Sequence, residues 1–340
     1  MDGDLKLGLI GAGRIGRVHA HTLARAVPGV GLAAIADVRL EAAQELARQY
    51  DVPVAVQDHL AILADPEIDA VVICTSTDTH ADLIVEAARA GKHVFCEKPI
   101  ALDLVETDRA LAAATEAGVK LQIGFNRRFD PSFRRVRDLV AQGRVGEPHI
   151  VHIISRDPAP PPIEYVKVSG GIFVDMTIHD FDMARFLTGS DIEEVTAVGA
   201  VLVDPAVGEA GDVDTALVTL RFVSGALGSI DNSRRAVYGY DQRVEVFGSR
   251  GSAAAGNQTP TNTVVADAEG IHQEKPLYFF LERYASAYVA ELQAFCDCLR
   301  QDVPPPVTGA DGRAALVAAL AATRSLREHR PVRVAEVEGG

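Results

Sequence analysis

The stretch that decides the fold is LKLGLIGAGRIG, residues 5–16. Its apolar run leads directly into Gly11, Gly13 and Gly16 at the spacing G-x-G-x-x-G, and a helical pattern follows. Glycines between a strand and a helix permit a tight turn and a close approach to a diphosphate, whose charge the helix N-terminus stabilises. In this context the pattern predicts a dinucleotide-binding α/β unit. The alternative is a glycine turn that binds no nucleotide.

The strand–helix rhythm that starts here continues to residue 124. We expect strands at 5–10, 31–37, 69–75, 92–98 and 119–125, with helices near 15–27, 40–50, 79–90 and 104–117. Apolar runs that alternate with helices are typical of a parallel sheet covered on both faces. Residues 1–124 are therefore predicted to form an N-terminal Rossmann domain with a doubly wound parallel sheet.

After Phe125 the pattern changes. A connecting helix is expected at 131–142, and helical patterns return at 281–300 and 310–329. Between them, strand-like segments with hairpin-sized gaps lie at 149–157, 193–203, 214–223, 225–233, 242–249 and 261–268. Such a succession of strands favours antiparallel pairing. We predict that residues 125–340 form an α+β domain with a large, mostly antiparallel open sheet, for substrate binding and oligomerisation.

Composition narrows the classes of function. The 340 residues carry a formal net charge of −14, which argues against a nucleic-acid partner and favours a small polar ligand. No apolar run approaches the roughly 18–20 residues that a membrane span needs, and no basic leader with a cleavage site precedes the first strand. The four cysteines lack the spacing of a zinc or disulfide framework. We therefore predict a cytoplasmic protein, with no metal and no membrane partner.

Polar residues follow two of the predicted strands, at the sheet edge where open α/β sheets bind ligands. Asp37 ends the second strand, where an acid accepts ribose hydroxyls and repels a 2′-phosphate, so NAD is predicted over NADP, with Arg39 as a counterweight. Thr75, Thr77 and His80 follow the next strand, although Asp78 or Thr79 there also suits a helix cap.

The motif Glu97–Lys98–Pro99 ends a further strand. A lysine at this position is expected to project into the cleft, where it could polarise an alcohol oxygen or share its proton. A surface lysine at a strand end is the simpler alternative.

The segment SGGIFVDMTIHDFDMARF, residues 169–186, contains a candidate acid–base centre. Asp175 and His179 are four residues apart, a spacing that on one helix places both side chains on the same face. A carboxylate can then orient an imidazole, and imidazole titrates near neutral pH. Gly170 and Gly171 would let a backbone or ligand approach closely. The alternative is a helix start with a solvated aspartate.

Together, G-x-G-x-x-G, E-K-P and G-G-x-x-x-D-x-x-x-H-D resemble the glucose–fructose oxidoreductase / inositol dehydrogenase / rhizopine catabolism family. The similarity runs from Leu5 to about Val334. Local stretches at 124–133, 155–166, 169–186, 232–251 and 276–288 resemble its inositol 2-dehydrogenase branch. That branch oxidises myo-inositol with NAD to 2-keto-myo-inositol, and its members are often homotetramers, which implies the same for this chain.

The resemblance also implies roles for individual residues. Lys98, Asp175 and His179 would be catalytic, and the polyol would contact Arg128, Asp157, Asp175, His179, Tyr238 and Tyr284. The cofactor would be held by Gly11, Gly13, Arg14, Ile15, Gly16, Asp37, Thr75, Thr77, His80, Glu97 and Lys98. Asn126 stands where some inositol dehydrogenases have methionine, which leaves the preferred polyol open.

Three other functions stay open at this point. One is a dehydrogenase for scyllo-inositol, glucose, galactose or a sugar acid. Another is an NAD-dependent glycosidase, which would produce no net NADH. The third is a non-catalytic NAD-binding regulator, although such a protein would not need Lys98, Asp175 and His179 together.

Overall fold

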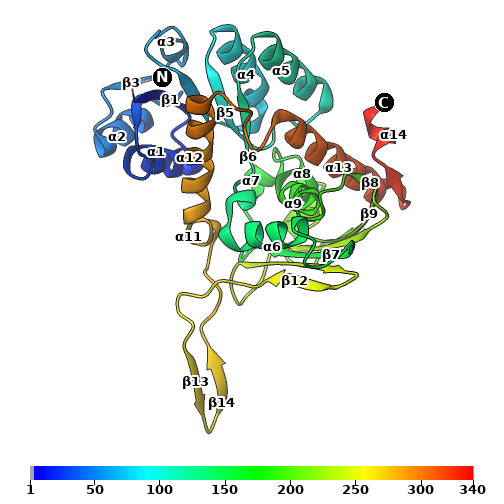
Figure 1. The fold of residues 1–340 in the computed structure, drawn as a ribbon. Coiled ribbons are helices and arrows are strands. Elements are labelled where there is room, and N and C mark those ends of the chain that lie inside the picture. The colour runs from blue at the N-terminus through cyan, green and yellow to red at the C-terminus, as the bar shows by residue number, and fades with distance from the viewer. Residues whose placement is uncertain (1–3, 340) are drawn as a thin grey trace. The chain divides into compact units, whose positions relative to one another are not determined.

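A computed structural model describes residues 4–339 of the chain. Figure 1 shows the chain coloured by residue number. The chain divides into two compact units. The first comprises the chain through Phe129 together with Ser286–Leu316, and the second comprises Asp130–Ala285 together with the chain from Val317 onward. Among the described residues, no helix is both long and apolar enough to cross a membrane.

The first unit is built on a six-stranded parallel sheet with the order β3-β2-β1-β4-β5-β6. Its strands are almost entirely apolar, because a parallel sheet is covered on both faces. The order reverses direction at β1 and β4, the position where doubly wound sheets bind ligands. The strands are β1 (Leu5–Ile10), β2 (Val30–Ala36), β3 (Val54–Val56), β4 (Ala70–Ile73), β5 (His93–Glu97) and β6 (Leu121–Gly124).

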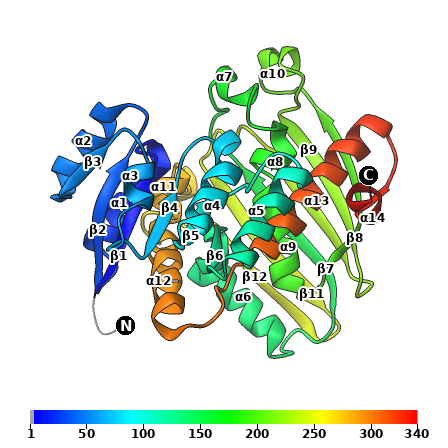
Figure 2. The same cartoon turned by 90° about the horizontal axis from the view of Figure 1, so that it is seen from above.

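Helices cover both faces of this sheet. Leu7 and Leu9 point into a core that also contains Leu23 of α1, Leu46 of α2 and Phe295 of α12. On the opposite face α4 and α5 run side by side (Figure 2), and α4 contacts β4 and β5. The helices are α1 (Arg14–Arg25), α2 (Leu40–Tyr50), α3 (Leu60–Leu63), α4 (His80–Arg89), α5 (Leu104–Glu116) and α12 (Ala285–Gln301), with short 3₁₀ turns η1 (Thr77–Thr79) and η2 (Asn126–Phe129).

The return of residues 286–316 to the first unit differs from the predicted division into 1–124 and 125–340. The physical reason is the apolar stripe of α12. Leu292, Phe295 and Leu299 are buried in the same core as the strands and helices of the N-terminal segment. A helix more than 150 residues downstream thus completes the N-terminal core, which local patterning does not reveal.

The second unit is built on a seven-stranded sheet with the order β12-β11-β7-β10-β9-β8-β15. All neighbouring strands are antiparallel except β7 and β10, which pair in parallel. The predicted fold class, a parallel Rossmann sheet followed by a mostly antiparallel one, is confirmed. The strands are β7 (Pro148–Arg156), β8 (Ile192–Ala200), β9 (Thr215–Phe222), β10 (Leu227–Ser233), β11 (Asp241–Gly248), β12 (Gly251–Ala255) and β15 (Val332–Arg333).

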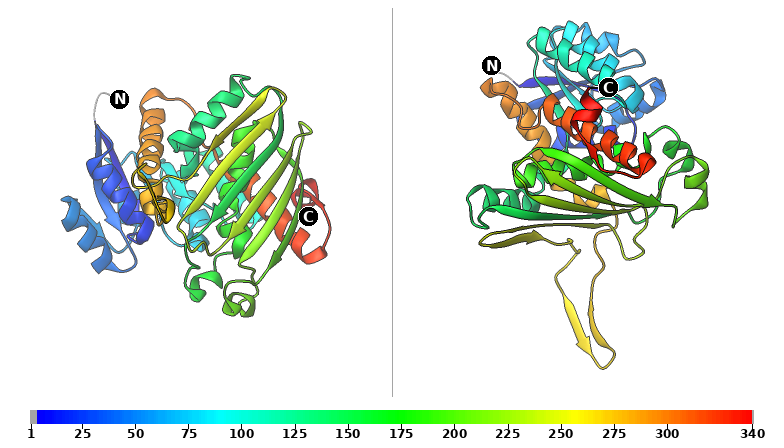
Figure 3. Two further views of the ribbon diagram at one scale, coloured as in Figure 1. Left: turned by 90° about the horizontal axis from the view of Figure 1, so that it is seen from below. Right: turned by 90° about the vertical axis from the view of Figure 1, so that its right-hand side faces the viewer.

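One face of this sheet carries the core and the other is open. Along β9 buried and exposed residues alternate, so Val218 and Leu220 face the helices while Leu217 faces outward. Figure 3 (left) shows the strands toward the viewer with helices behind them. Those of this unit are α6 (Pro131–Ala141), α7 (Ile163–Val166), α8 (Gly171–Asp175), α9 (Ile178–Thr188), α10 (Pro205–Glu209), α11 (Phe280–Arg283), α14 (Ala335–Glu338) and, from Val317, α13 (Gly309–Glu328).

The segment 261–268, expected among the strands of the large sheet, forms a separate hairpin instead. There β13 (Val264–Asp267) pairs only with β14 (Gly270–Gln273), and the two extend away from the rest of the unit (Figure 1). All four residues of β13 are exposed, so strand-like composition here does not reflect burial in a core.

Candidate active site

The glycine turn after β1 has the geometry that a dinucleotide requires. Gly11 has φ +102°, and a Cβ there would lie 2.7 Å from the Cys74 carbonyl. A Cβ on Gly16 would lie 1.9 Å from the Gly11 carbonyl oxygen, so the chain itself requires both glycines. Gly13 differs: no described atom lies within 4 Å of its Cβ position. The open space at Gly13, at the N-terminus of α1, fits a close diphosphate.

Asp37 is fixed beside this turn at the end of β2. Its Oδ2 accepts the Ala12 N–H at 2.7 Å, and its Oδ1 accepts the Arg39 N–H at 2.8 Å. Only 10% of the carboxylate side chain is exposed, whereas the Arg39 side chain is 74% exposed, with its Nε 3.8 Å from Oδ1. A rigid carboxylate at this edge is suited to accept hydroxyl groups of a ribose.

The residues after β4 are tied together by hydrogen bonds. Thr75 Oγ1 lies 2.6 Å from Thr79 Oγ1. The His80 ring is buried, with Nδ1 2.8 Å from the Pro99 carbonyl oxygen and Nε2 3.2 Å from the Thr75 carbonyl oxygen. Burial lowers the pKa of His80. The histidine therefore links the turns after β4 and β5, while Thr77, on η1, is half-buried.

Glu97 and Lys98 lie at the end of β5 with different surroundings. Lys98 is half-buried, whereas the Glu97 carboxylate enters the core and its Oε1 lies 2.6 Å from His19 Nε2. Glu291 of α12 is fully buried in the same place. One ligand atom from each of Glu97, His19 and Glu291 lies within 4.8 Å of the others, and the His19 and Glu97 side chains are bonded directly to each other.

In the second unit, Asp175 and His179 do not share one helix. Asp175 is the last residue of α8, a turn follows at Met176 and Thr177, and His179 lies in the first turn of α9. The prediction of a single helix is therefore wrong. The Met176 and Thr177 N–H groups both donate to the Ile172 carbonyl, which closes α8 before α9 begins. Gly170 and Gly171 both have positive φ, 84° and 81°, which explains the glycine pair conformationally.

The Asp175 carboxylate is held by two donors from other elements. Tyr165 Oη donates to Oδ1 at 2.8 Å, and Arg234 Nη1 donates to Oδ2 at 2.9 Å. Thirteen per cent of the Asp175 side chain is exposed, so the carboxylate is mostly enclosed but reachable. Both donors were absent from the sequence-based site. The arginine-rich NSRR motif, residues 232–235, is the one local signal that pointed toward Arg234.

The predicted polyol contacts occupy varied environments. Asp157 is half-buried after β7. Tyr238 is 38% exposed, and its Oη accepts from Arg156 Nη1 at 3.0 Å and donates to Asp241. Burial and the Asp241 carboxylate raise the pKa of Tyr238. Tyr284 is only 1% exposed, and its Oη donates to Gln242 Oε1 at 3.3 Å.

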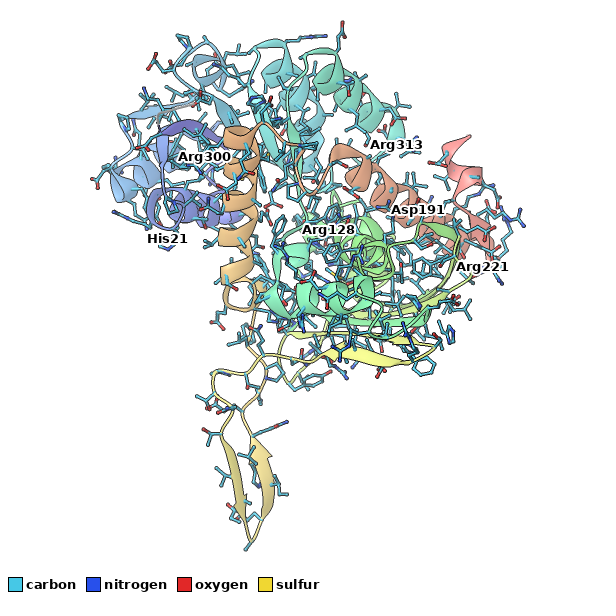
Figure 4. The ribbon with its side chains drawn as sticks, viewed as in Figure 1. His21, Arg128, Asp191, Arg221, Arg300 and Arg313 are labelled. Atoms are coloured by element: carbon cyan, nitrogen blue, oxygen red, sulfur yellow. The ribbon has the colours of Figure 1, made fainter. Side chains whose placement is uncertain are left out.

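Arg128 belongs to the first unit and is labelled in Figure 4. Its Nη2 donates to Asp311 Oδ1 at 2.9 Å. Burial alone would raise the pKa of Asp311, but Arg128 and donors from Thr308 outweigh it and lower that pKa. Asn126, two residues earlier, is buried, and its Nδ2 has no hydrogen-bond partner among residues 4–339.

The glycine turn, the fixed Asp37 and the parallel sheet are the features of a Rossmann fold. Residues 5–125 match the oxidoreductase family with an NAD-binding Rossmann fold. The GFO/IDH/MocA C-terminal domain matches residues 133–254. The chain therefore belongs to the GFO/IDH/MocA family, the glucose–fructose oxidoreductase / inositol dehydrogenase / rhizopine catabolism family expected from its motifs.

Known members of this family resemble the chain over its full length. The myo-inositol 2-dehydrogenase of Thermotoga maritima is 51% identical over 98% of this chain and 100% of its own. The inositol 2-dehydrogenase of Rhizobium meliloti is 50% identical, over 97% and 99%. The crystal structure of Lactobacillus casei scyllo-inositol dehydrogenase with bound NAD(H) and scyllo-inositol has a TM-score of 0.91 and 31% identity, over 97% and 99%.

Proposed function

We propose that this protein catalyses the NAD-dependent oxidation of myo-inositol, or a close cyclic polyol, to 2-keto-myo-inositol. The full-length identity of about half with two relatives named for inositol 2-dehydrogenation carries the proposal. The alternative substrate is scyllo-inositol, which the Lactobacillus casei relative binds, but that protein is less similar at 31% identity.

The chemistry requires one proton acceptor and one oxyanion stabiliser. His179 would remove the hydroxyl proton of the carbinol, and the Asp175 carboxylate would orient the imidazole. The Lys98 ammonium would stabilise the developing alkoxide. The glycine turn and Asp37 would hold NAD, which would supply the acceptor for the hydride of the carbinol carbon. As the family resemblance implies, Tyr238, Asp157, Tyr284 and Arg128 would supply donors and acceptors suited to a ring of hydroxyls.

A screen of NADH production over the inositol isomers, glucose and galactose tests the proposal. Turnover should be highest with an inositol, and His179→Ala should lower kcat by roughly 10²–10⁴-fold, the scale of lost general acid–base catalysis. His152→Ala is the control, because His152 is an exposed histidine of β7 in the same unit. Near-normal turnover of His179→Ala would remove His179 from the mechanism.

The same screen separates the rival functions. Cleavage of a glycoside without net NADH would indicate a glycosidase, and NAD binding without turnover of any sugar or polyol would indicate a regulator. Highest turnover with glucose or galactose would indicate a dehydrogenase of another specificity.

The preference for NAD over NADP rests on Asp37. Two backbone N–H groups fix the Asp37 carboxylate, and the Arg39 side chain beside it is mostly exposed, so a 2′-phosphate would meet a fixed negative charge. We expect a higher kcat/KM with NAD than with NADP, and a smaller ratio after Asp37→Ser, which leaves Arg39 in place. A wild-type preference for NADP would refute this prediction.

Three further properties stay predictions: a cytoplasmic location, independence of metal ions and a homotetrameric state. Turnover that is unchanged by a chelator would support metal independence.

A further inference from the structure

Arg234 is a buried cation that no step of the proposed chemistry uses. It follows β10 directly, and its side chain is 1% exposed. Its backbone N–H donates to the Asp214 carbonyl at 2.8 Å, which fixes the start of the side chain. Burying a guanidinium is unfavourable unless carboxylates compensate it.

Two aspartates face this guanidinium: Asp175 is part of α8, and Asp212 contacts the start of that helix. Arg234 Nη1 donates to Asp175 Oδ2 at 2.9 Å, and Nη2 lies 3.9 Å from Asp212 Oδ2. Asp212 Oδ1 in turn accepts the Ile172 N–H at 3.1 Å, in the first turn of α8. Asp175 is the last residue of the same helix. Arg234 therefore contacts one carboxylate at each end of α8.

Close contacts at both ends of α8 restrict how this arrangement can change. A Cβ on Gly171 would lie 3.0 Å from Asp212 Oδ1, so the helix start and Asp212 are already in close contact. At the other end, Tyr165 occupies Asp175 Oδ1 while Arg234 occupies Oδ2. With Tyr165 on one oxygen and Arg234 on the other, residues from two separate elements hold the plane of the carboxylate.

We propose that Arg234 is a positioning residue for the reaction, which fixes the Asp175 carboxylate and the end of α8 in the orientation that turnover requires. The proposal rests on the proposed function of Asp175 as a member of the catalytic group. A guanidinium is suited to the task because its planar fork can serve two carboxylates at once, whereas an ammonium is a compact point charge. The effect of removing Arg234 should therefore pass through Asp175.

The test uses the full-length protein and the variants Arg234→Met and Arg234→Lys. Arg234→Met should lower kcat by about 10²-fold, the usual effect of a misplaced catalytic group, and leave the Kd for NAD unchanged, because the glycine turn and Asp37 belong to the other unit. Arg234→Lys should recover part of kcat, since lysine restores the positive charge but not the planar guanidinium group. Arg221→Met, an exposed arginine of β9, is the control for loss of an arginine from this sheet.

A double-mutant cycle distinguishes positioning from simple loss of structure. In the Asp175→Asn background, Arg234→Met should lower kcat by less than threefold further, and should lower the melting temperature less than it does in the wild type. Full multiplication of the two effects on kcat, or additive losses of melting temperature, would overturn the proposal. So would an Arg234→Met protein that retains wild-type kcat.

The melting-temperature cycle needs no substrate. Should the wild type oxidise no polyol or sugar in the screen, the proposed function fails while the coupling between residues 234 and 175 is still measured. A coupling between residues 234 and 175 in melting temperature would then support the proposal that Arg234 fixes Asp175. Its absence would refute that proposal.

Discussion

At the scale of single residues, Glu291 is a fully buried carboxyl group of the first unit. It shares the interior with Glu97, whose carboxylate is bonded to His19. Both oxygens of Glu291 lack a hydrogen-bond partner among the described residues. Burial, and then the charge of Glu97, raise the pKa of Glu291 well above its ordinary value of 4.5. The neutral acid is thus the form that the fold accommodates.

The raised pKa of Glu291 makes the stability of the protein depend on pH. Because the folded-state pKa lies above the unfolded one, the folded protein binds the proton more tightly between the two values. The stabilisation is complete below pH 4.5 and is lost as the pH rises through the folded-state pKa. Glu291→Gln mimics the neutral acid, so it should make the decline of the free energy of unfolding shallower, by at most about 1.4 kcal/mol per pH unit.

Urea unfolding at a series of pH values measures this difference. Glu116→Gln, an exposed glutamate at the end of α5, is the control and should follow the wild-type curve. Parallel curves for Glu291→Gln and the wild type would contradict the prediction.

At the scale of elements, α6 begins with a cap that is also a buried ion pair. Asp130 Oδ1 accepts the N–H groups of Ser132 and Phe133, each at 3.0 Å, and Oδ2 bonds Arg283 Nη1. Both charged side chains are 1% exposed. Pro131 follows at the first helical position, where its fixed φ suits a helix start.

Removal of this cap should affect stability far more than removal of an exposed one. Asp130→Ala leaves Arg283 buried without its carboxylate, and it should lower the free energy of unfolding by about 3–5 kcal/mol. Asp103→Ala, which removes the exposed cap of α5, should lower it by about 1 kcal/mol. Urea unfolding followed by circular dichroism compares the two, and equal losses would show that the buried pair adds nothing to capping.

At the scale of the whole molecule, the open face of the second sheet is the candidate surface for the predicted homotetramer. Val198 and Leu217 lie directly opposite each other on β8 and β9 and are 61% and 55% exposed. Leu227 and Phe247, also outward, are 48% and 45% exposed. An apolar patch of this kind is typical of a surface that a second copy covers.

Substitution of both Val198 and Leu217 by lysine should shift the protein to smaller assemblies, because charges would have to be buried at the interface. Sedimentation velocity measures the change. Val223→Lys, 70% exposed in the turn after β9, is the control. A wild-type monomer at micromolar concentration would refute the tetramer, and an unchanged sedimentation coefficient in the double variant would exclude this face.

The local pattern of the chain was enough to predict most elements of the first unit and the glycine turn between β1 and α1. Alternating apolar runs and helices encode the first sheet, and Gly11, Gly16 and Asp37 lie where the strand–turn–helix context predicts. Such features depend on neighbours within a few residues, so periodicity and turn chemistry are sufficient to recognise them.

Only the tertiary structure decided which segments distant in the sequence pair, pack or form hydrogen bonds with one another. It pairs β7 with β10 in parallel, returns α12 to the N-terminal core and breaks the helix between Asp175 and His179. It also brings Arg234 to Asp175 from 59 residues away. The reason is that a buried apolar stripe needs an apolar surface to pack against, and a buried charge needs an opposite charge. Either partner can come from a distant part of the chain, so local spacing does not specify it.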